Sequence, residues 1–362
     1  MKAGLLPIGY GVFGLGKMMA NVANSLANCY GYEVELITSH SINLSEISER
    51  YDIEMRGVNI RSIPQLVKKL NDSRYLYRKI NHLNFSFFSR QFDLFWVQTS
   101  YIPYLSFSDS SFLQVDFPFD RSPRANFWKK RLDSYQAVIA NSEFTQYWIQ
   151  KYWGVASHVI YPPIFPIIPA KKKPWILCVG RFVSGRRDKK QLELIEAFKH
   201  LCDNGLVGWQ FNIVGIIQDQ NYFDAVLDAA QGYPIRVYPN TSFNTLAELY
   251  AQSSIFWHAV GLGINPEDEP HRLEHFGMVT AEAMTAKCVP VVIGLGGQRE
   301  IVENNYSGFL CNSIDEMEIY TTQLVEDKDL MMRMANRARL AAVEKFGSNA
   351  FDHRLEKIMS IL

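Results

Sequence analysis

Short apolar runs alternate with segments of helical period along most of the chain. Continuous apolar runs of four to eight residues are typical of buried strands, and apolar residues spaced three and four apart are typical of helices. Residues 4–8 predict a first strand, and residues 17–28 predict a helix with Met18, Val22 and Leu26 on one face. Such alternation favours an α/β fold with mostly parallel sheets.

The same criteria predict strands in both halves of the chain. They lie at residues 33–38, 92–97, 137–140, 175–179, 211–214, 235–238, 255–257, 290–293 and 308–311. The tail, residues 327–362, has helical period with an interruption near Gly347. The chain therefore reads as two successive α/β halves followed by helices.

A proline-rich stretch separates the two halves. Residues 162–169 hold four prolines, which disfavour both a helix and a central strand and favour a stiff connector. A length of 362 residues also suits two domains. We predict one domain at 1–165, a second at 170–345 and a final helix at 346–362.

Charge and cysteine usage narrow the class of protein. The 37 basic and 37 acidic residues balance, so no overall field favours nucleic acid. The basic clusters at 129–131 and 171–173 are typical of solvated faces, although weak association with a membrane surface stays open. Five scattered cysteines without a CxxC pair indicate reduced thiols and a cytoplasmic location. Neither a signal peptide nor a spanning apolar run of about 20 residues is expected.

Residues 9–14 match GxGxxG between a strand and a helix. Such a loop brings backbone amides and a helix N-terminus to a phosphate. A dinucleotide site also needs an acidic residue near the end of the second strand, and residues 37–39 are Ile-Thr-Ser. NAD binding is therefore disfavoured, while a plain tight turn and a phosphate- or substrate-facing loop ending at Gly14 both stay open.

A second candidate follows the strand at 175–179. Arg181 comes just beyond its carboxyl end, where ligands bind in open α/β sheets, and Lys189 follows in a polar loop. A guanidinium and an ammonium group suit a diphosphate. A solvated basic loop is the alternative.

The densest candidate is residues 270–284. Gly277 is expected to end a loop and open a helix, so that amides at Gly277, Met278 and Val279 face an anion. Glu274 lies before that helix and Glu282 within it. The two carboxylates are placed to bracket the hydroxyl groups of a ligand.

Two metal motifs compete with this interpretation. Residues 271–275 match HxxEH, a zinc-peptidase signature that needs both histidines on one continuous helix. Pro270 and Gly277 leave barely two turns for it. Residues 327–329 match DxD, and an acidic first turn of a helix explains them better.

With these residues in place, the chain resembles the retaining glycosyltransferases of family four, which have the GT-B fold. The resemblance rests on Glu274 and Glu282 with seven residues between them, on Val179-Gly180-Arg181-Phe182, on Lys189-Lys190-Gln191 and on Ala140-Asn141-Ser142. It implies two Rossmann-like domains facing across a cleft, the first binding the acceptor and the second the nucleotide-sugar, with the C-terminal helix crossing back to the first domain.

The resemblance also implies roles. Arg181 and Lys189 would neutralise the donor diphosphate, assisted by amides of Gly277, Met278 and Val279. Glu274 would hold hydroxyls of the transferred sugar and Glu282 the ribose, while Gly14 would lie under the donor phosphates or the acceptor. Catalysis would need no metal and no cofactor beyond the UDP- or GDP-sugar co-substrate.

Two departures from the family pattern stand out. Many relatives carry a histidine in the first domain where this chain has residues 113–118, and Gln114 or Asp116 could substitute. Relatives also place glycine at a helix end where this chain has Lys287, which predicts strain or a different cap.

We therefore expect a hexosyltransferase of polysaccharide biosynthesis, acting on a glycan or lipid-linked glycan, in the cytoplasm or at the inner face of the membrane. The Glu-His-Phe-Gly wording at 274–277 is similar to that of mannosyltransferases. A non-catalytic sugar-nucleotide binding protein of the same fold is the alternative, and an HxxEH zinc peptidase is a more remote one.

Overall fold

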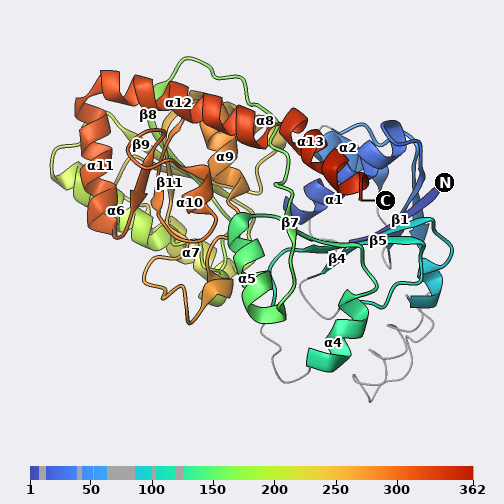
Figure 1. Ribbon diagram of the computed structural model, residues 1–362. Coiled ribbons are helices and arrows are strands. Elements are labelled where there is room, and N and C mark those ends of the chain that lie inside the picture. The colour runs from blue at the N-terminus through green and yellow to red at the C-terminus, as the bar shows by residue number, and fades with distance from the viewer. Residues whose placement is uncertain are drawn as a thin grey trace. The chain divides into compact units, whose positions relative to one another are not determined.

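The structure is a computed structural model that describes residues 1–7, 14–38, 43–51, 53–62, 86–99, 103–119 and 125–361. The chain divides into two compact units (Figure 1). Unit 1 comprises Met1–Pro163 and Phe351–Leu362, and unit 2 comprises Ile164–Ala350. The domain limits given above from the sequence remain a prediction.

Unit 1 is built on a parallel sheet of seven strands within the described residues, in the order β3-β2-β1-β4-β5-β6-β7. The strands are β1 Lys2–Leu6, β2 Glu33–Thr38, β3 Val58–Ser62, β4 Leu94–Thr99, β5 Ser110–Val115, β6 Ala137–Ala140 and β7 His158–Val159. The helices are α1 Gly14–Asn28, α2 Leu44–Tyr51, α4 Ala125–Leu132 and α5 Glu143–Trp153, joined by the end of α13 Ser348–Met359.

One hydrophobic cluster of unit 1 lies between its sheet and two helices. Alternate residues of β4 and β5, among them Phe95 and Leu113, pack with Trp128 of α4 and Ile149 of α5. On α1, Ser25 Oγ lies 3.4 Å from an oxygen of the Asp352 carboxylate, which belongs to α13. The C-terminal helix is therefore part of unit 1 from residue 351 onward.

Unit 2 is built on a parallel sheet with the order β10-β9-β8-β11-β12-β13. Its strands are β8 Lys173–Val179, β9 Gln210–Gly215, β10 Ile235–Pro239, β11 Ser253–His258, β12 Val289–Ile293 and β13 Phe309–Cys311. β8 and β11 are the central pair, and their inner residues 176–178 and 255–257 are apolar and buried. Such strands are typical of parallel sheets covered on both faces.

Helices cover both faces of the second sheet (Figure 1). One layer contains α6 Gln191–Asp203, α7 Gln220–Ala229 and α11 Ile314–Glu326. The other contains α8 Phe243–Gln252, α9 Met278–Thr285 and α12 Lys328–Phe346. The short helix α10 Gln298–Ile301 contacts α9.

The α/β fold expected from the sequence is confirmed, with two parallel sheets. The strands at 33–38 and 137–140 are confirmed to the residue, and Gly347 separates α12 from α13 as expected. The first strand begins and ends two residues earlier than predicted, and β3, β5 and β7 were not predicted. Asp327 caps α12 through Leu330 N–H, which confirms the helix-turn interpretation of 327–329.

Candidate functional site

The candidate site lies at the carboxyl ends of β8 and β11, in the middle of the unit 2 sheet. Arg181 follows β8, and His258 is the last residue of β11. The loop after β11 then leads to Glu274 and to α9. Because the carboxyl ends of parallel strands meet at one edge of a sheet, these residues are brought to the same edge.

The loop before α6 places Lys189. Lys190 has a left-handed backbone, with φ of 63°, and its N–H donates to Asp188 Oδ1 at 2.7 Å. The buried amide of Gln191 donates to the carbonyl oxygens of Gly180 and Arg181, each at 3.1 Å. These contacts join the segment that directly follows β8 to the start of α6. The positions of Arg181 and Lys189 are therefore coupled.

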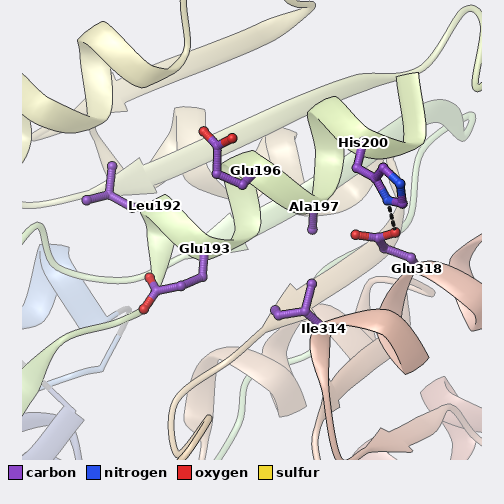
Figure 2. A pocket seen from close by; sticks show the side chains of 7 residues that line it. All are labelled: Leu192, Glu193, Glu196, Ala197, His200, Ile314 and Glu318. Atoms are coloured by element: carbon purple, nitrogen blue, oxygen red, sulfur yellow. Dashed lines mark hydrogen bonds and ion pairs between the residues drawn. The ribbon is translucent and has the colours of Figure 1, made fainter. Parts of the chain in front are cut away.

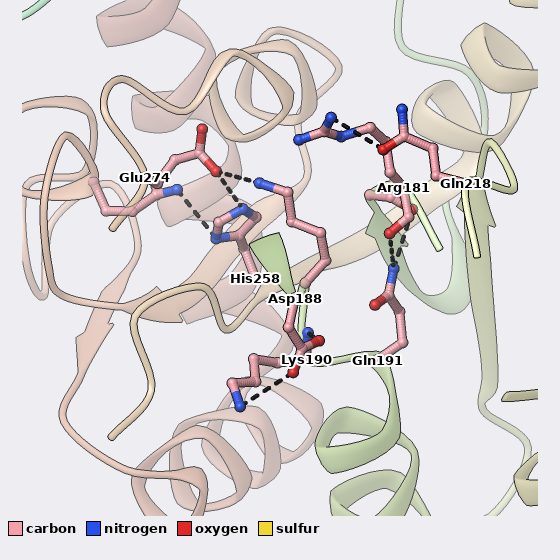
Figure 3. A network of polar contacts seen from close by, with 10 residues as sticks. Arg181, Asp188, Lys190, Gln191, Gln218, His258 and Glu274 are labelled. Carbon is pink, nitrogen blue, oxygen red and sulfur yellow. Dashed lines mark hydrogen bonds and ion pairs between the residues drawn. The ribbon is translucent and has the colours of Figure 1, made fainter. Parts of the chain in front are cut away.

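Glu274 is held through both its backbone and its side chain. Its carbonyl accepts from Gly297 N–H at 2.7 Å. A Cβ at Gly296 would lie 2.3 Å from the same oxygen, and Gly296 has φ of 62°, so the turn needs glycine on both counts. The carboxylate Oε2 lies 2.8 Å from Lys189 Nζ and 3.3 Å from His258 Nε2 (Figure 3).

These neighbours keep Glu274 ionised. Although burial raises the pKa of the Glu274 carboxyl, Lys189 and His258 together hold it well below its usual range. The Lys189 and Glu274 side chains are 19% and 21% exposed, so the pair is shielded from solvent but remains open to a ligand. The site thus holds a carboxylate and a cation together, as binding of sugar hydroxyls beside a phosphate requires.

Gly277 begins the helix that follows Glu274. Its φ of 114° is in a region that glycine favours, and α9 starts at the next residue. The first amides of a helix have no partner within it and carry the positive end of its dipole. Met278 and Val279 supply those amides, so the helix start is where the sequence placed it, and its groups favour an anion.

Glu282 has a different set of neighbours from Glu274. The Tyr250 hydroxyl lies 3.3 Å from Glu282 Oε2 and 3.3 Å from the Val279 carbonyl oxygen. Tyr250 comes from α8 and is buried, and burial raises the pKa of its hydroxyl well above the usual value. The residue therefore stays a neutral donor to the carboxylate.

Arg181 is turned to the loop between β9 and α7. Its Nη1 donates to Gln218 Oε1 at 3.2 Å, and Figure 3 shows this pair beside the Glu274 contacts. Gly14 is the first residue of α1 in unit 1. The loop residues before it lie outside the described part of the chain. Six of the eight predicted site residues thus gather between the loop before α6 and the start of α9: Lys189, Glu274, Gly277, Met278, Val279 and Glu282.

Sequence reasoning missed three supporting residues. His258, Gln298 and Tyr250 each contact a predicted site residue or its neighbour, and each is nearly fully buried. His258 alone had a usable signal, since a histidine that ends a buried strand lies at the edge where ligands bind.

The structure does not form the helix that HxxEH needs. A single 3-10 turn covers Pro270–Arg272, and Leu273 is already extended. His271 and His275 are therefore not on one continuous helix, and the peptidase alternative is wrong.

A separate surface pocket lies between α6 and α11 (Figure 2). It is lined by Leu192, Glu193, Glu196, Ala197, His200, Ile314 and Glu318. Its carboxylates already have cations: Glu193 pairs with Lys190 at 2.7 Å, and Glu196 pairs with Lys199 at 3.0 Å. Because none of the predicted site residues lines this pocket, it is not part of the site.

Two α/β units, each built on a parallel sheet, with such a site in the second unit are typical of glycosyltransferases of the GT-B class. Comparison with known proteins supports the same class. The family model described as Glycosyl transferases group 1 matches residues 164–341, and the one described as Glycosyltransferase Family 4 matches residues 12–166. The chain belongs to these glycosyltransferases.

Curated relatives are distant. The human alpha-1,3/1,6-mannosyltransferase ALG2 is 24% identical over 62% of this chain and 58% of its own length. The GDP-Man:Man(3)GlcNAc(2)-PP-Dol alpha-1,2-mannosyltransferase of Dictyostelium discoideum is 22% identical, over 62% of this chain and 47% of its own. The matched part therefore spans about half the length of these relatives.

Solved structures share the fold over the whole chain. A glycosyltransferase from Rickettsia africae has a TM-score of 0.75 at 17% identity, covering 99% of this chain and 98% of its own. The Anabaena protein Alr3699/HepE, in complex with UDP and glucose, has a TM-score of 0.74 at 17% identity, with both chains fully covered. Within the described residues, no helix is long and apolar enough to cross a membrane.

Proposed function

We propose that the chain is a retaining, metal-independent glycosyltransferase that moves a hexose from a UDP- or GDP-sugar to a glycan or lipid-linked glycan. The observation that carries the proposal is the 2.8 Å Lys189–Glu274 pair, whose carboxylate shortly precedes Gly277, the N-cap of α9, in the chain. A diphosphate and a sugar are adjacent in UDP- and GDP-sugars, and so are the groups that would bind them here.

Transfer breaks the bond between the anomeric carbon and the diphosphate oxygen. Negative charge then grows on the diphosphate while the sugar acquires oxocarbenium character. Arg181, Lys189 and the amides of Met278 and Val279 are fixed positive groups that would stabilise the departing diphosphate. The acceptor hydroxyl forms the new bond from the same face, and its proton passes to the departing diphosphate.

Glu274 and Glu282 would orient the donor. Glu274 would accept hydrogen bonds from hydroxyls of the transferred sugar, and Glu282 from the ribose. Gly14, the first residue of α1, would lie under the donor phosphates or the acceptor. The name of the Dictyostelium relative includes GDP-Man, and the Anabaena protein was solved with UDP and glucose, so we propose mannose and glucose as the first sugars to test. Five free cysteines support a reducing, cytoplasmic location.

The test is a screen of nucleotide-sugars with the purified protein. UDP-glucose, UDP-galactose and GDP-mannose are incubated with oligosaccharide and lipid-linked acceptors, and nucleoside diphosphate release is measured with and without EDTA. One donor should be turned over equally in EDTA. Glu274→Ala should abolish transfer, whereas Glu267→Ala, an exposed carboxylate in the same loop, should not.

Two outcomes would contradict the proposal. Loss of activity in EDTA would remove metal independence. Binding of a donor by calorimetry without transfer to any acceptor would favour the non-catalytic binding protein.

A further inference from the structure

His258 is a polar side chain in a buried place at the end of a strand. It is the last residue of β11 and is only 3% exposed. Its ring nonetheless faces polar groups on both sides, from the loop that carries Glu274 and from α10 (Figure 3).

The two ring nitrogens have separate neighbours. Nε2 lies 3.3 Å from Glu274 Oε2, and Nδ1 lies 3.3 Å from Nε2 of Gln298. Gln298 is the first residue of α10 and is fully buried. One side chain therefore bridges a strand end, the Glu274 loop and the helix that follows the Gly296–Gly297 turn.

These neighbours select one tautomer. With the amide nitrogen of Gln298 turned toward it, Nδ1 accepts, and the ring proton then lies on Nε2. Nε2 is then the N–H nearest the Glu274 carboxylate, 3.3 Å from Oε2, and the contact is electrostatic because it lacks the alignment of a hydrogen bond. The opposite tautomer would place a nitrogen lone pair against a carboxylate and an N–H against an amide donor.

Charge agrees with this assignment. Burial lowers the pKa of His258, and the nearby Lys189 ammonium lowers it further, while Glu274 acts in the opposite direction. The net shift is downward. Glu274 and Lys189 are the charged groups that act on the ring, and a neutral ring leaves them as a balanced pair.

We propose that His258 is a positioning residue, which as the neutral Nε2–H tautomer holds the Glu274 carboxylate in place for the donor sugar. The proposal rests on the proposed function for its consequence in transfer. When a diphosphate draws the Lys189 ammonium toward itself, His258 remains as a support for the carboxylate.

A role in packing alone is the competing explanation, since the ring of His258 lies 6.5 Å from that of Phe256 at an interplanar angle of 21°. His258→Phe keeps an aromatic ring and removes both nitrogens. His258→Gln keeps an N–H donor close to the position of Nε2. The pair of variants therefore separates packing from hydrogen bonding.

The first experiment needs no turnover. The protein is labelled with ¹⁵N-histidine, the His258 signals are assigned by their loss in His258→Gln, and long-range ¹⁵N–¹H spectra are recorded without ligand from pH 6 to 8. The expected result is a neutral ring protonated at Nε2 throughout. A ring protonated at Nδ1, or an imidazolium, would overturn the proposal even if transfer were established.

The second experiment uses the donor identified by the screen. His258→Phe should lower kcat by about 10- to 100-fold, as expected for loss of a buried polar contact to a charged group, and change the donor KM by less than about threefold. His258→Gln should recover kcat to within about fivefold of wild type. His353→Phe, which replaces an exposed histidine on α13, should have no effect.

Folding is checked by thermal melts of each variant. Wild-type kcat in His258→Phe, or an equal loss in both variants, would show that packing is the whole role. If no donor is turned over, the proposed function fails, while the NMR result still decides the tautomer.

Discussion

Lys189 Nζ lies 2.8 Å from Glu274 Oε2, so the cation proposed for the diphosphate and the carboxylate proposed for the sugar neutralise each other before a donor is bound. Donor binding must therefore compete with an existing ion pair. Such a pair lowers the attraction of the empty site for free phosphate and keeps both side chains ordered.

Glu274→Gln should separate binding from transfer. The amide leaves the Lys189 charge uncompensated, so UDP or GDP should bind about three- to tenfold more tightly by calorimetry. Transfer should fall by about 100-fold or more, because the amide is a poorer acceptor for sugar hydroxyls. Lys189→Met is the matched variant and should weaken binding of the same nucleotide. Weaker nucleotide binding in Glu274→Gln would mean that the pair does not restrain Lys189.

Tyr250→Phe should affect the ribose side of the site. Loss of the hydroxyl leaves Glu282 without its contact from α8, and we expect about 1 kcal/mol lower stability and about fivefold weaker binding of UDP or GDP. Thermal melts and calorimetry measure the two effects. Tyr233→Phe, which removes an exposed hydroxyl bonded to Asp203, serves as control. Unchanged affinity would separate Glu282 from nucleoside binding.

Lys287 should be a site for stabilisation. It has φ of 64° at the end of α9, where its N–H reaches Met284 O and the Cys288 N–H reaches Ala283 O. This is a Schellman motif, which favours glycine at the left-handed position, as the family pattern suggested. Lys287→Gly should raise stability by about 1 kcal/mol, whereas Lys287→Ala should give no gain. A melting temperature higher by about 2–4 °C would show it.

Asp116 should make the stability of unit 1 depend on pH. Burial raises the pKa of its carboxyl to about 7, while Gln98 Nε2, 3.0 Å away, acts against the shift. The folded protein therefore holds this proton more tightly than the unfolded chain, whose ordinary value is 3.8. The stability from this group is complete below pH 4 and is lost as the pH rises through 7.

Asp116→Asn tests that dependence. Wild type and variant should have similar melting temperatures near pH 4, and the variant should be the more stable by up to about 4 kcal/mol at pH 8. A difference that stays constant from pH 4 to pH 8 would mean that Asp116 does not titrate in this range.

Sequence patterns predicted the strands that are continuous apolar runs and missed strands that polar residues interrupt. The sequence of β5 is Ser-Ser-Phe-Leu-Gln-Val. Its Gln114 is buried, and the side-chain oxygen accepts a hydrogen bond from the Trp96 indole N–H at 3.1 Å. Because this hydrogen bond satisfies the amide oxygen, a polar residue takes the place that an apolar residue has in a usual buried strand. β3 is an edge strand, so its exposed Asn59 gives no buried run.

The site residues with charge were predictable because they follow strand ends or open a helix. Their buried supports were not, because a contact such as that between His258 and Gln298 joins residues forty positions apart and leaves no periodic signal. From the sequence, Lys189 was expected to bind the diphosphate and Glu274 the sugar. That the two side chains form an ion pair is known only from the structure.

The turn at Gly296 and Gly297 has a consequence for how the chain tolerates change. Glu274 takes its position from that turn, from Lys189 and from His258, none of them adjacent in sequence. The length of the preceding segment, residues 259–269, therefore does not determine where the Glu274 carboxylate lies. Residues inserted at the exposed Glu267–Asp268 tip should leave the carboxylate where it is, which makes this loop a natural place to graft a reporter or an affinity tag beside a working site.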